Sequence, residues 1–230
     1  MKELFVNSAT VGVVISLLAY QIGMFVRNKT KKDICNPFMI AVMLVIAFLL
    51  LFDIDYDSYN QSAKYLSYLL TPATVSLAIP LYEKLDLLKK HFGAIILGIL
   101  AGVLTSLISI LGMSCLFGLS HSEYVTLLPK SITIAIGFGV SEELGGYASI
   151  TAASVMLTGI LGNIIGEFIC KYFRIKHAIS RGLAIGTSSH AIGTAKAMEM
   201  GEVEGAMSSL SIVVAGLMTV VLASVFATFY

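Results

Sequence analysis

Hydroxyl residues accompany helix-breaking residues in two stretches of the sequence that nearly repeat each other. Residues 70–80 read Leu-Thr-Pro-Ala-Thr-Val-Ser-Leu-Ala-Ile-Pro, and residues 127–137 read Leu-Leu-Pro-Lys-Ser-Ile-Thr-Ile-Ala-Ile-Gly. Each stretch has an early proline, hydroxyl residues at alternate positions and a second helix breaker at its end. The breakers are Pro72, Pro80, Pro129 and Gly137. Because proline removes a backbone donor and disturbs the preceding turn, both stretches predict interrupted helices with free backbone groups beside hydroxyls.

An interrupted helix in apolar surroundings can bind an anion. The N-terminus of a half-helix presents unpaired N–H groups and a partial positive charge, which favour a carboxylate. The candidate substrate-binding side chains of the two stretches are Thr71, Thr74, Ser76, Lys130, Ser131 and Thr133. Lys130 could neutralise an anion, or it could extend to the membrane surface from a helix end. A kinked helix whose hydroxyls bond its own carbonyls is the better explanation of a single stretch, but two matched stretches favour a binding site.

A third group of polar residues lies within the segment 182–198. Residues 186–196 place four hydroxyls, a histidine and a lysine in otherwise apolar sequence, which is costly in a membrane unless they face a polar cavity. This segment adds the binding candidates Ser188, Ser189 and Thr194. His190 is the leading proton-coupling candidate, because histidine titrates near neutral pH; alternatively, it only hydrogen-bonds a neighbouring helix. Glu142 and Glu143 either are solvated or bind a proton or cation beside a path.

The composition indicates a membrane protein. Of the 230 residues, 57% are hydrophobic and 13% are charged, whereas soluble domains carry about 25% charged residues. At about 20 apolar residues per span, the chain suits one all-α polytopic domain, residues 1–230, with about seven or eight membrane segments. We expect pseudo-symmetric broken or re-entrant helices at 65–82 and 124–140. The glycine spacings Gly98-x-x-x-Gly102 and Gly162-x-x-x-Gly166 predict close helix contacts and are compatible with a homo-oligomer.

Basic residues predict the orientation of the chain. The loops 27–33, 84–91 and 171–181 are rich in Lys, Arg or His and are expected on the cytoplasmic side by the positive-inside rule. They lie between hydrophobic spans, which argues against a nucleic-acid site. If 124–140 crossed the membrane fully, the loop 171–181 would lie outside, so we expect 124–140 to be a re-entrant hairpin. A topology with an unusual positive loop outside is the alternative.

The sequence lacks the usual motifs of an enzyme or a metal centre. It contains no Gly-x-Ser-x-Gly elbow, no phosphate-binding loop and no His/Glu metal spacing on a helix. Cys35, Cys115 and Cys170 are far apart and show no Cys-x-x-Cys or Cys/His pattern. We therefore expect no enzymatic activity, no cofactor and no metal.

Two motifs carry a family resemblance. Residues 182–196, Gly-Leu-Ala-Ile-Gly-Thr-Ser-Ser-His-Ala-Ile-Gly-Thr-Ala-Lys, and residues 204–210, Glu-Gly-Ala-Met-Ser-Ser-Leu, resemble the LrgB/CidB family of bacterial membrane proteins. The run Ser-Glu-Glu-Leu-Gly-Gly at 141–146 fits as well, and the resemblance covers essentially the whole chain. It implies a bacterial plasma-membrane location and two competing roles. One is a holin- or antiholin-like modulator of murein hydrolase activity and cell lysis, acting with a small LrgA/CidA-type membrane partner.

The other role is transport, because a related plant plastid protein moves glycolate and glycerate and bacterial relatives are linked to pyruvate uptake. The residues favour transport, since a lesion-forming holin needs no broken helices, buried hydroxyls or membrane histidine. We therefore predict a proton-coupled transporter of a small monocarboxylate, with the holin- or antiholin-like role as the alternative. A purely structural subunit, whose LrgA-type partner provides the path, is a third interpretation.

Overall fold

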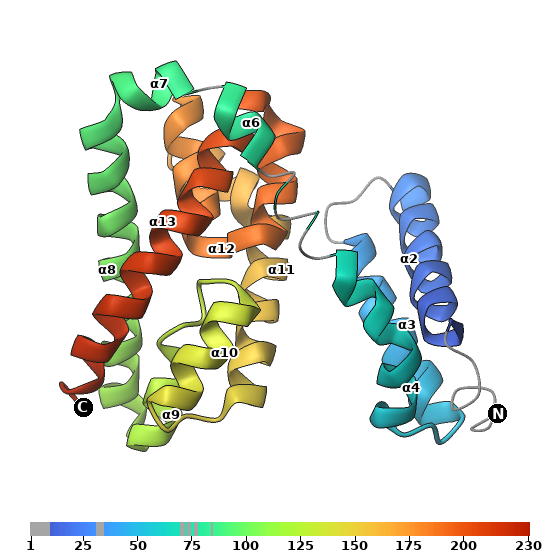
Figure 1. Cartoon of the computed structure of the whole chain (residues 1–230). Helices are drawn as coiled ribbons and strands as arrows, with labels where there is room; N and C mark the ends of the chain where they lie inside the picture. The colour runs from blue at the N-terminus through green and yellow to red at the C-terminus, as the bar shows by residue number, and fades with distance from the viewer. Residues whose placement is uncertain (1–9, 31–34, 70–71, 73–74, 76–77, 84) are drawn as a thin grey trace. The chain divides into compact units, whose positions relative to one another are not determined.

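The described part of the chain is helical and forms two compact units. The computed structural model describes residues 10–30, 35–69, 72, 75, 78–83 and 85–230, and the two units comprise residues 1–76 and 77–230. The regular structure in these ranges is helical throughout (Figure 1), which confirms the all-α prediction. The expectation of a single domain over residues 1–230 stays a prediction.

Unit 1 is built from a helical hairpin and a shorter segment. It contains α2 (Val11–Thr30), α3 (Pro37–Leu51), α4 (Tyr56–Ala63) and the 3₁₀ helix η1 (Lys64–Leu69). The Asn36 side chain accepts a hydrogen bond from the backbone N–H of Phe38 at 2.9 Å, and Pro37 occupies the first turn, where its missing N–H costs nothing. The Ser62 hydroxyl accepts from the backbone N–H of Gly12 at 2.9 Å, so α4 caps the free first turn of α2.

Unit 2 contains the remaining helices. They are α6 (Ala78–Glu83), α7 (Leu85–Lys90), α8 (Phe92–Phe117), α9 (His121–Leu127), α10 (Ile134–Glu143), α11 (Ala148–Tyr172), α12 (Ala178–Met200) and α13 (Glu202–Ala227). Together with α2, the helices α8, α11 and α13 are long and apolar enough to cross a membrane. A buried stripe along α8 joins the core shared with α13; its residues are Ile95, Ile99, Val103, Leu107 and Ile110. The outward faces carry exposed apolar side chains such as Leu97, Leu157 and Leu217, as expected of helices that contact lipid.

The second predicted broken stretch is interrupted in the structure. Helix α9 ends at Leu127 and α10 begins at Ile134, so residues 128–133 form a turn between them. This hairpin lies at the end of unit 2 that holds the C-terminus, opposite α7 (Figure 1). The prediction that Gly137 breaks the helix is wrong, because Gly137 lies inside α10 and its N–H donates to the Thr133 carbonyl at 2.8 Å. A methyl group there would lie 3.3 Å from the Pro129 carbonyl oxygen, so glycine allows α10 to pack on the turn.

The first predicted broken stretch is only partly described. Thr71, Thr74 and Ser76 lie outside the described residues, and so does most of the backbone around Pro72. Helix α6 continues through Pro80 from Ala78 to Glu83, so the break predicted at Pro80 is not seen. Proline is tolerated in a first turn because no intrahelical hydrogen bond is lost there.

Helix α12 folds back on itself at His190. His190 has φ 42° and ψ −140°, which is not helical. A methyl group on Gly193 would lie 3.1 Å from Cγ2 of Ile185, eight residues earlier, whereas residues eight apart in a straight helix are about 12 Å apart. Gly182 lies against Glu204, and Gly205 against Met198. Helix α12 is therefore a hairpin with a first arm (178–189) and a second arm (191–200), which both pack along the start of α13.

Candidate functional site

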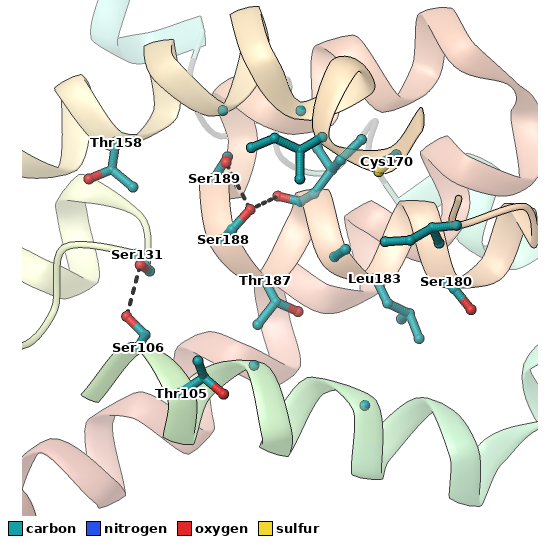
Figure 2. A pocket seen from close by; sticks show the side chains of 18 of the residues that line it. Thr105, Ser106, Ser131, Thr158, Cys170, Ser180, Leu183, Thr187, Ser188 and Ser189 are labelled. Atoms are coloured by element: carbon teal, nitrogen blue, oxygen red, sulfur yellow. Dashed lines mark hydrogen bonds between the residues drawn. The ribbon is translucent and has the colours of Figure 1, made fainter. Parts of the chain in front are cut away.

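A cavity of about 790 Å³ lies between α8, α11, the turn 128–133 and the first arm of α12 (Figure 2). Nine of its lining residues carry hydroxyls: Thr105, Ser106, Ser109, Ser131, Thr158, Ser180, Thr187, Ser188 and Ser189. Among the lining residues in the described ranges, Lys130 is the one with a charge. The cavity brings together the tips of the two hairpins, which are 57 residues apart in sequence when measured from Ser131 to Ser188. Its volume suits a small ligand.

Three small-residue contacts place the first arm of α12 between α8 and α11. A methyl group on Gly102 of α8 would lie 2.7 Å from Cγ2 of Thr187, and one on Gly98 would lie 3.6 Å from Cδ1 of Leu183. On α11, Gly162 lies against Ser189 in the same way. Small residues allow helix backbones to approach closely in membranes, so the predicted glycine spacings act within this chain. They set the width of the cavity.

The turn of the α9–α10 hairpin forms a cationic end of the cavity. The Lys130 Nζ donates to the Ser131 hydroxyl at 3.2 Å, and Ser131 and Ser106 hydroxyls hydrogen-bond each other at 3.2 Å (Figure 2). Lys130 is half-buried and makes no ion pair with any residue that the structure describes. A partly buried ammonium group whose only partner is a hydroxyl is suited to binding an anion.

His190 holds the tip of the α12 hairpin rather than lining the cavity. Its side chain belongs to a residue that is 3% exposed, and its Nε2 donates to the Val155 carbonyl of α11 at 2.9 Å. A methyl group on Gly159 would lie 2.7 Å from its Cε1 atom, so the imidazole packs directly on α11. This geometry fits the alternative that His190 bonds a neighbouring helix; proton coupling through it stays a prediction.

Side chains of α12 itself and of α11 donate hydrogen bonds to the backbone carbonyls around this break. The Thr194 hydroxyl donates to the His190 carbonyl at 2.9 Å, and the Asn163 amide of α11 donates to the Ile192 carbonyl at 2.8 Å. The Thr194 hydroxyl also hydrogen-bonds that of Ser208 on α13 at 2.7 Å. Non-helical backbone at membrane depth requires such partners. Thr194 is therefore buried behind the tip and does not line the cavity.

Of the other predicted site residues, some line the cavity and others lie outside it. Ser188 and Ser189 line the cavity, and their hydroxyls bond each other at 3.0 Å (Figure 2). Thr133 is the N-cap residue of α10 and lies outside the set of lining residues. Glu142 and Glu143 are exposed at the end of α10, in agreement with the solvated alternative. In the described ranges, no three His, Cys, Asp or Glu side chains are placed to hold a metal ion.

Comparison with known proteins identifies the family. A model of the LrgB-like family matches residues 16–229. This chain belongs to the LrgB-like family. An antiholin-like protein LrgB of Bacillus cereus (strain B4264) is 38% identical over 219 residues, which cover 95% of each chain. An antiholin-like protein LrgB of Bacillus anthracis (strain CDC 684 / NRRL 3495) shows the same identity and coverage. No solved structure matches.

A group of ion pairs lies beside a second, smaller cavity of this LrgB-like chain. The Lys196 Nζ, on a residue that is 8% exposed, lies 3.0 Å from Glu167 Oε2 and 3.5 Å from Glu199 Oε2. Arg181 Nη1 lies 3.6 Å from Glu204 Oε1. Glu167, Arg181 and Glu199 of these pairs line this smaller cavity of about 210 Å³, and Cys170 lines both this cavity and the larger one. The Lys196–Glu167 pair thus joins the second arm of α12 to α11, and the Arg181–Glu204 pair joins the first arm to α13.

The substrate-binding residues chosen from the sequence do not include six of the cavity hydroxyls in this LrgB-like chain. They are Thr105, Ser106, Ser109, Thr158, Ser180 and Thr187. A signal existed on α8, where Gly98, Gly102 and Ser106 follow one another at intervals of four residues and so share one face. When a hydroxyl residue follows two glycines on the same face of a helix, that face can line a cavity as well as contact another helix.

Proposed function

We propose that this LrgB-like protein is a membrane carrier for small monocarboxylates of the pyruvate, glycolate and glycerate class, coupled to protons. The observation that carries the proposal is the hydroxyl-lined cavity in which Lys130 has no carboxylate partner among the described residues. Ionisable residues within membrane segments are costly and mark substrate or ion pathways. A substrate carboxylate would supply the missing negative charge.

The interrupted backbone supports the same function. Carriers of several folds place their substrates where membrane helices are discontinuous, and irregular backbone at membrane depth requires a protein interior or a water-filled cavity. The turn 128–133 and the break at His190 belong to two hairpins whose tips reach one cavity. A protein that only forms lesions has no need of this arrangement.

The cavity is asymmetric along the helices. Helices α8 and α11 run in opposite directions (Figure 1), and the lining residues extend from Ala94 to Ser109 on α8 and from Cys170 back to Thr158 on α11. Ala94 and Cys170 lie next to α7 and the basic connector 171–181, which the positive-inside rule assigns to the cytoplasm. In this orientation the cavity extends toward the cytoplasm, the α12 hairpin starts from the cytoplasmic side and the α9–α10 hairpin from the outside.

The names of the relatives favour a second candidate function, the antiholin-like one. Proteins 38% identical to this chain are named antiholin-like protein LrgB, so an antiholin-like modulator of murein hydrolase activity and lysis is the alternative function. In that role the chain would act with an LrgA/CidA-type small membrane protein or with further copies of itself. A carrier and a lesion-forming, holin-like protein differ in what crosses the membrane: a carrier passes a single small acid, and a lesion passes solutes without size selection.

Reconstitution separates the candidates. The purified full chain in liposomes is tested for uptake of labelled pyruvate, glycolate or glycerate, with and without a pH gradient, and for leakage of a large fluorescent dye. We expect saturable uptake without dye leakage, with Lys130→Gln reducing uptake at least tenfold. Lys176→Gln, which removes an exposed charge from the connector, is the matched control and should transport normally.

The other outcomes assign the chain to another class. Dye leakage that does not depend on solute size supports the holin-like form of the alternative function. Uptake that appears only after addition of an LrgA-type partner shows that the partner provides the path. Uptake that is equal with and without a pH gradient removes proton coupling from the proposal.

A further inference from the structure

Lys130 combines the two properties that a proton-coupling group needs, because it can gain and lose a proton and it lines the cavity. Among the lining residues that the structure describes, only Lys130 and Cys170 have side chains that titrate. The Cys170 thiol lies at the other end of the cavity from Ser131 and Thr158 (Figure 2). Twelve residues of α11 separate Thr158 from Cys170, which corresponds to about 18 Å. Of these two groups, Lys130 is the one beside a ligand at the hairpin tips.

His190 is occupied elsewhere. It is 3% exposed, and it does not belong to the described residues that line the cavity. Its Nε2 proton is used in the hydrogen bond to the Val155 carbonyl at 2.9 Å. A methyl group on Gly159 would lie 2.7 Å from its Cε1 atom, so the ring has no room to turn away from α11. Release of the Nε2 proton would break the bond that holds the tip of the α12 hairpin.

The other titratable side chains of residues 92–230 either have partners of their own or are exposed. The paired acids are Glu167, Glu199 and Glu204, which face Lys196 or Arg181, and Glu123, which belongs to the capping box of α9. The exposed ones include His121, His177, Glu142, Glu143 and Glu202. Glu142 lies eight residues beyond the start of α10, about 12 Å along the helix from the turn 128–133. Among the described residues, the Lys130 ammonium therefore has the Ser131 hydroxyl as its partner and no carboxylate.

This lack of a carboxylate determines what the empty carrier must do. A charge that is removed from water without a partner is costly. With a substrate bound, the Lys130 ammonium and the substrate carboxylate form a neutral pair. Without a substrate, the ammonium would remain alone while the cavity changes sides. A neutral amine avoids this cost, and lysine can release its proton whereas arginine cannot.

We propose that Lys130 is the proton-coupling residue of the carrier. Its amine takes up one proton on the side where the substrate enters, and the ammonium then holds the substrate carboxylate as a neutral pair. After the acid has left on the other side, the ammonium gives its proton to water and the empty carrier returns with a neutral amine. Each cycle thus moves one proton and one carboxylate together, without net charge. This inference rests on the proposed carrier function and assigns its coupling to Lys130, with His190 as a positioning residue.

The test separates exchange from net uptake. Exchange is the entry of labelled glycolate into liposomes that contain unlabelled glycolate at equal pH, and it needs only the loaded carrier. Net uptake is accumulation in empty liposomes with an acidic medium outside, and it also needs the return of the empty carrier. Uptake by protein-free liposomes is subtracted from both.

Lys130→Arg keeps the cation but not the ability to release a proton. We expect it to retain exchange within about threefold of the wild type and to lose net uptake by about tenfold or more, because a guanidinium stays charged. Lys176→Arg makes the same change at an exposed residue of the connector. This control should keep both activities.

Two more variants complete the test. Lys130→Gln carries no proton, so its residual uptake at high glycolate concentration should be equal with and without the pH gradient. His190→Gln should still accumulate glycolate in response to the gradient. If Lys130→Arg loses exchange as well, the gradient dependence of Lys130→Gln decides.

The remaining outcomes contradict the assignment or the carrier. Gradient-driven accumulation by Lys130→Arg, gradient-dependent uptake by Lys130→Gln, or loss of the gradient response in His190→Gln with exchange intact overturns the role of Lys130 and leaves the carrier in place. A wild-type chain that shows neither exchange nor net uptake overturns the carrier function and this inference with it.

Discussion

Replacement of Glu167 by glutamine should loosen the second arm of the α12 hairpin. The Lys196 ammonium lies 3.0 Å from Glu167 and 3.5 Å from Glu199, and only 10% of the lysine side chain is exposed. At an effective dielectric constant of about 20, two unit charges about 4 Å apart attract each other by about 4 kcal/mol. Glu199 remains as a partner and the new amide oxygen still accepts a hydrogen bond. We therefore expect Glu167→Gln to reduce the free energy of unfolding by about 2 kcal/mol.

The buried thiol of Cys170 reports this change. Cys170 is 3% exposed beside the ion pairs, and replacing Cys35 and Cys115 by serine leaves it as the single thiol. Maleimide labelling during heating in detergent should give a lower midpoint for Glu167→Gln than for its parent. The control is Lys171→Met, which removes a Glu167 partner at 2.8 Å that is 72% exposed; such surface pairs contribute about 0–1 kcal/mol. Equal shifts in both variants would refute the reasoning.

Three further predictions concern the packing of α12 and are checked by thermal unfolding in detergent. Gly162→Ala should lower the free energy of unfolding by about 1–3 kcal/mol, because its methyl group would overlap a serine of α12. The control Gly112→Ala, whose methyl group would have no neighbouring atom within 4 Å, should cause no loss. Equal losses in the two variants would contradict this reasoning. Thr194→Val should lower the free energy of unfolding by about 1–3 kcal/mol, because two buried hydrogen bonds are lost. Thr187→Val removes a hydroxyl without a partner among the described residues and should lose no hydrogen bond, so a clear destabilisation by this variant would contradict the unpaired hydroxyl. His190→Ala should be about 1 kcal/mol less stable than His190→Gly, because φ of 42° suits glycine; the reverse order shows that this backbone is not left-handed.

The interruption at 128–133 could be predicted because its cause is local. Pro129 has no N–H and disturbs the turn before it whatever surrounds it, and the structure ends α9 at Leu127. The helix break predicted at Gly137 was wrong. Glycine permits many backbone conformations without requiring any, and here close packing on the turn keeps it helical.

The fold-back at His190 could not be predicted, although its polar residues were recognised. No proline lies in 178–200, and the break depends on partners in α11 and α13, namely the Val155 carbonyl, the Asn163 amide and the Ser208 hydroxyl. The cavity hydroxyls of α8 and α11 were missed for a related reason. Serine and threonine in helices usually bond their own backbone, and only the arrangement of three helices shows which of them face a common space.

The most direct test of the account is the sidedness of the two ends of α12. Lys176→Cys, Glu202→Cys and Glu143→Cys, all at exposed positions, are introduced singly into a chain without other cysteines. A thiol reagent that cannot cross membranes is then applied to right-side-out and inverted vesicles. A hairpin predicts that positions 176 and 202 react from the same, cytoplasmic side and position 143 from the opposite side. Reaction of 176 and 202 from opposite sides would mean that α12 crosses the membrane, and the shared cavity between two hairpin tips would be contradicted.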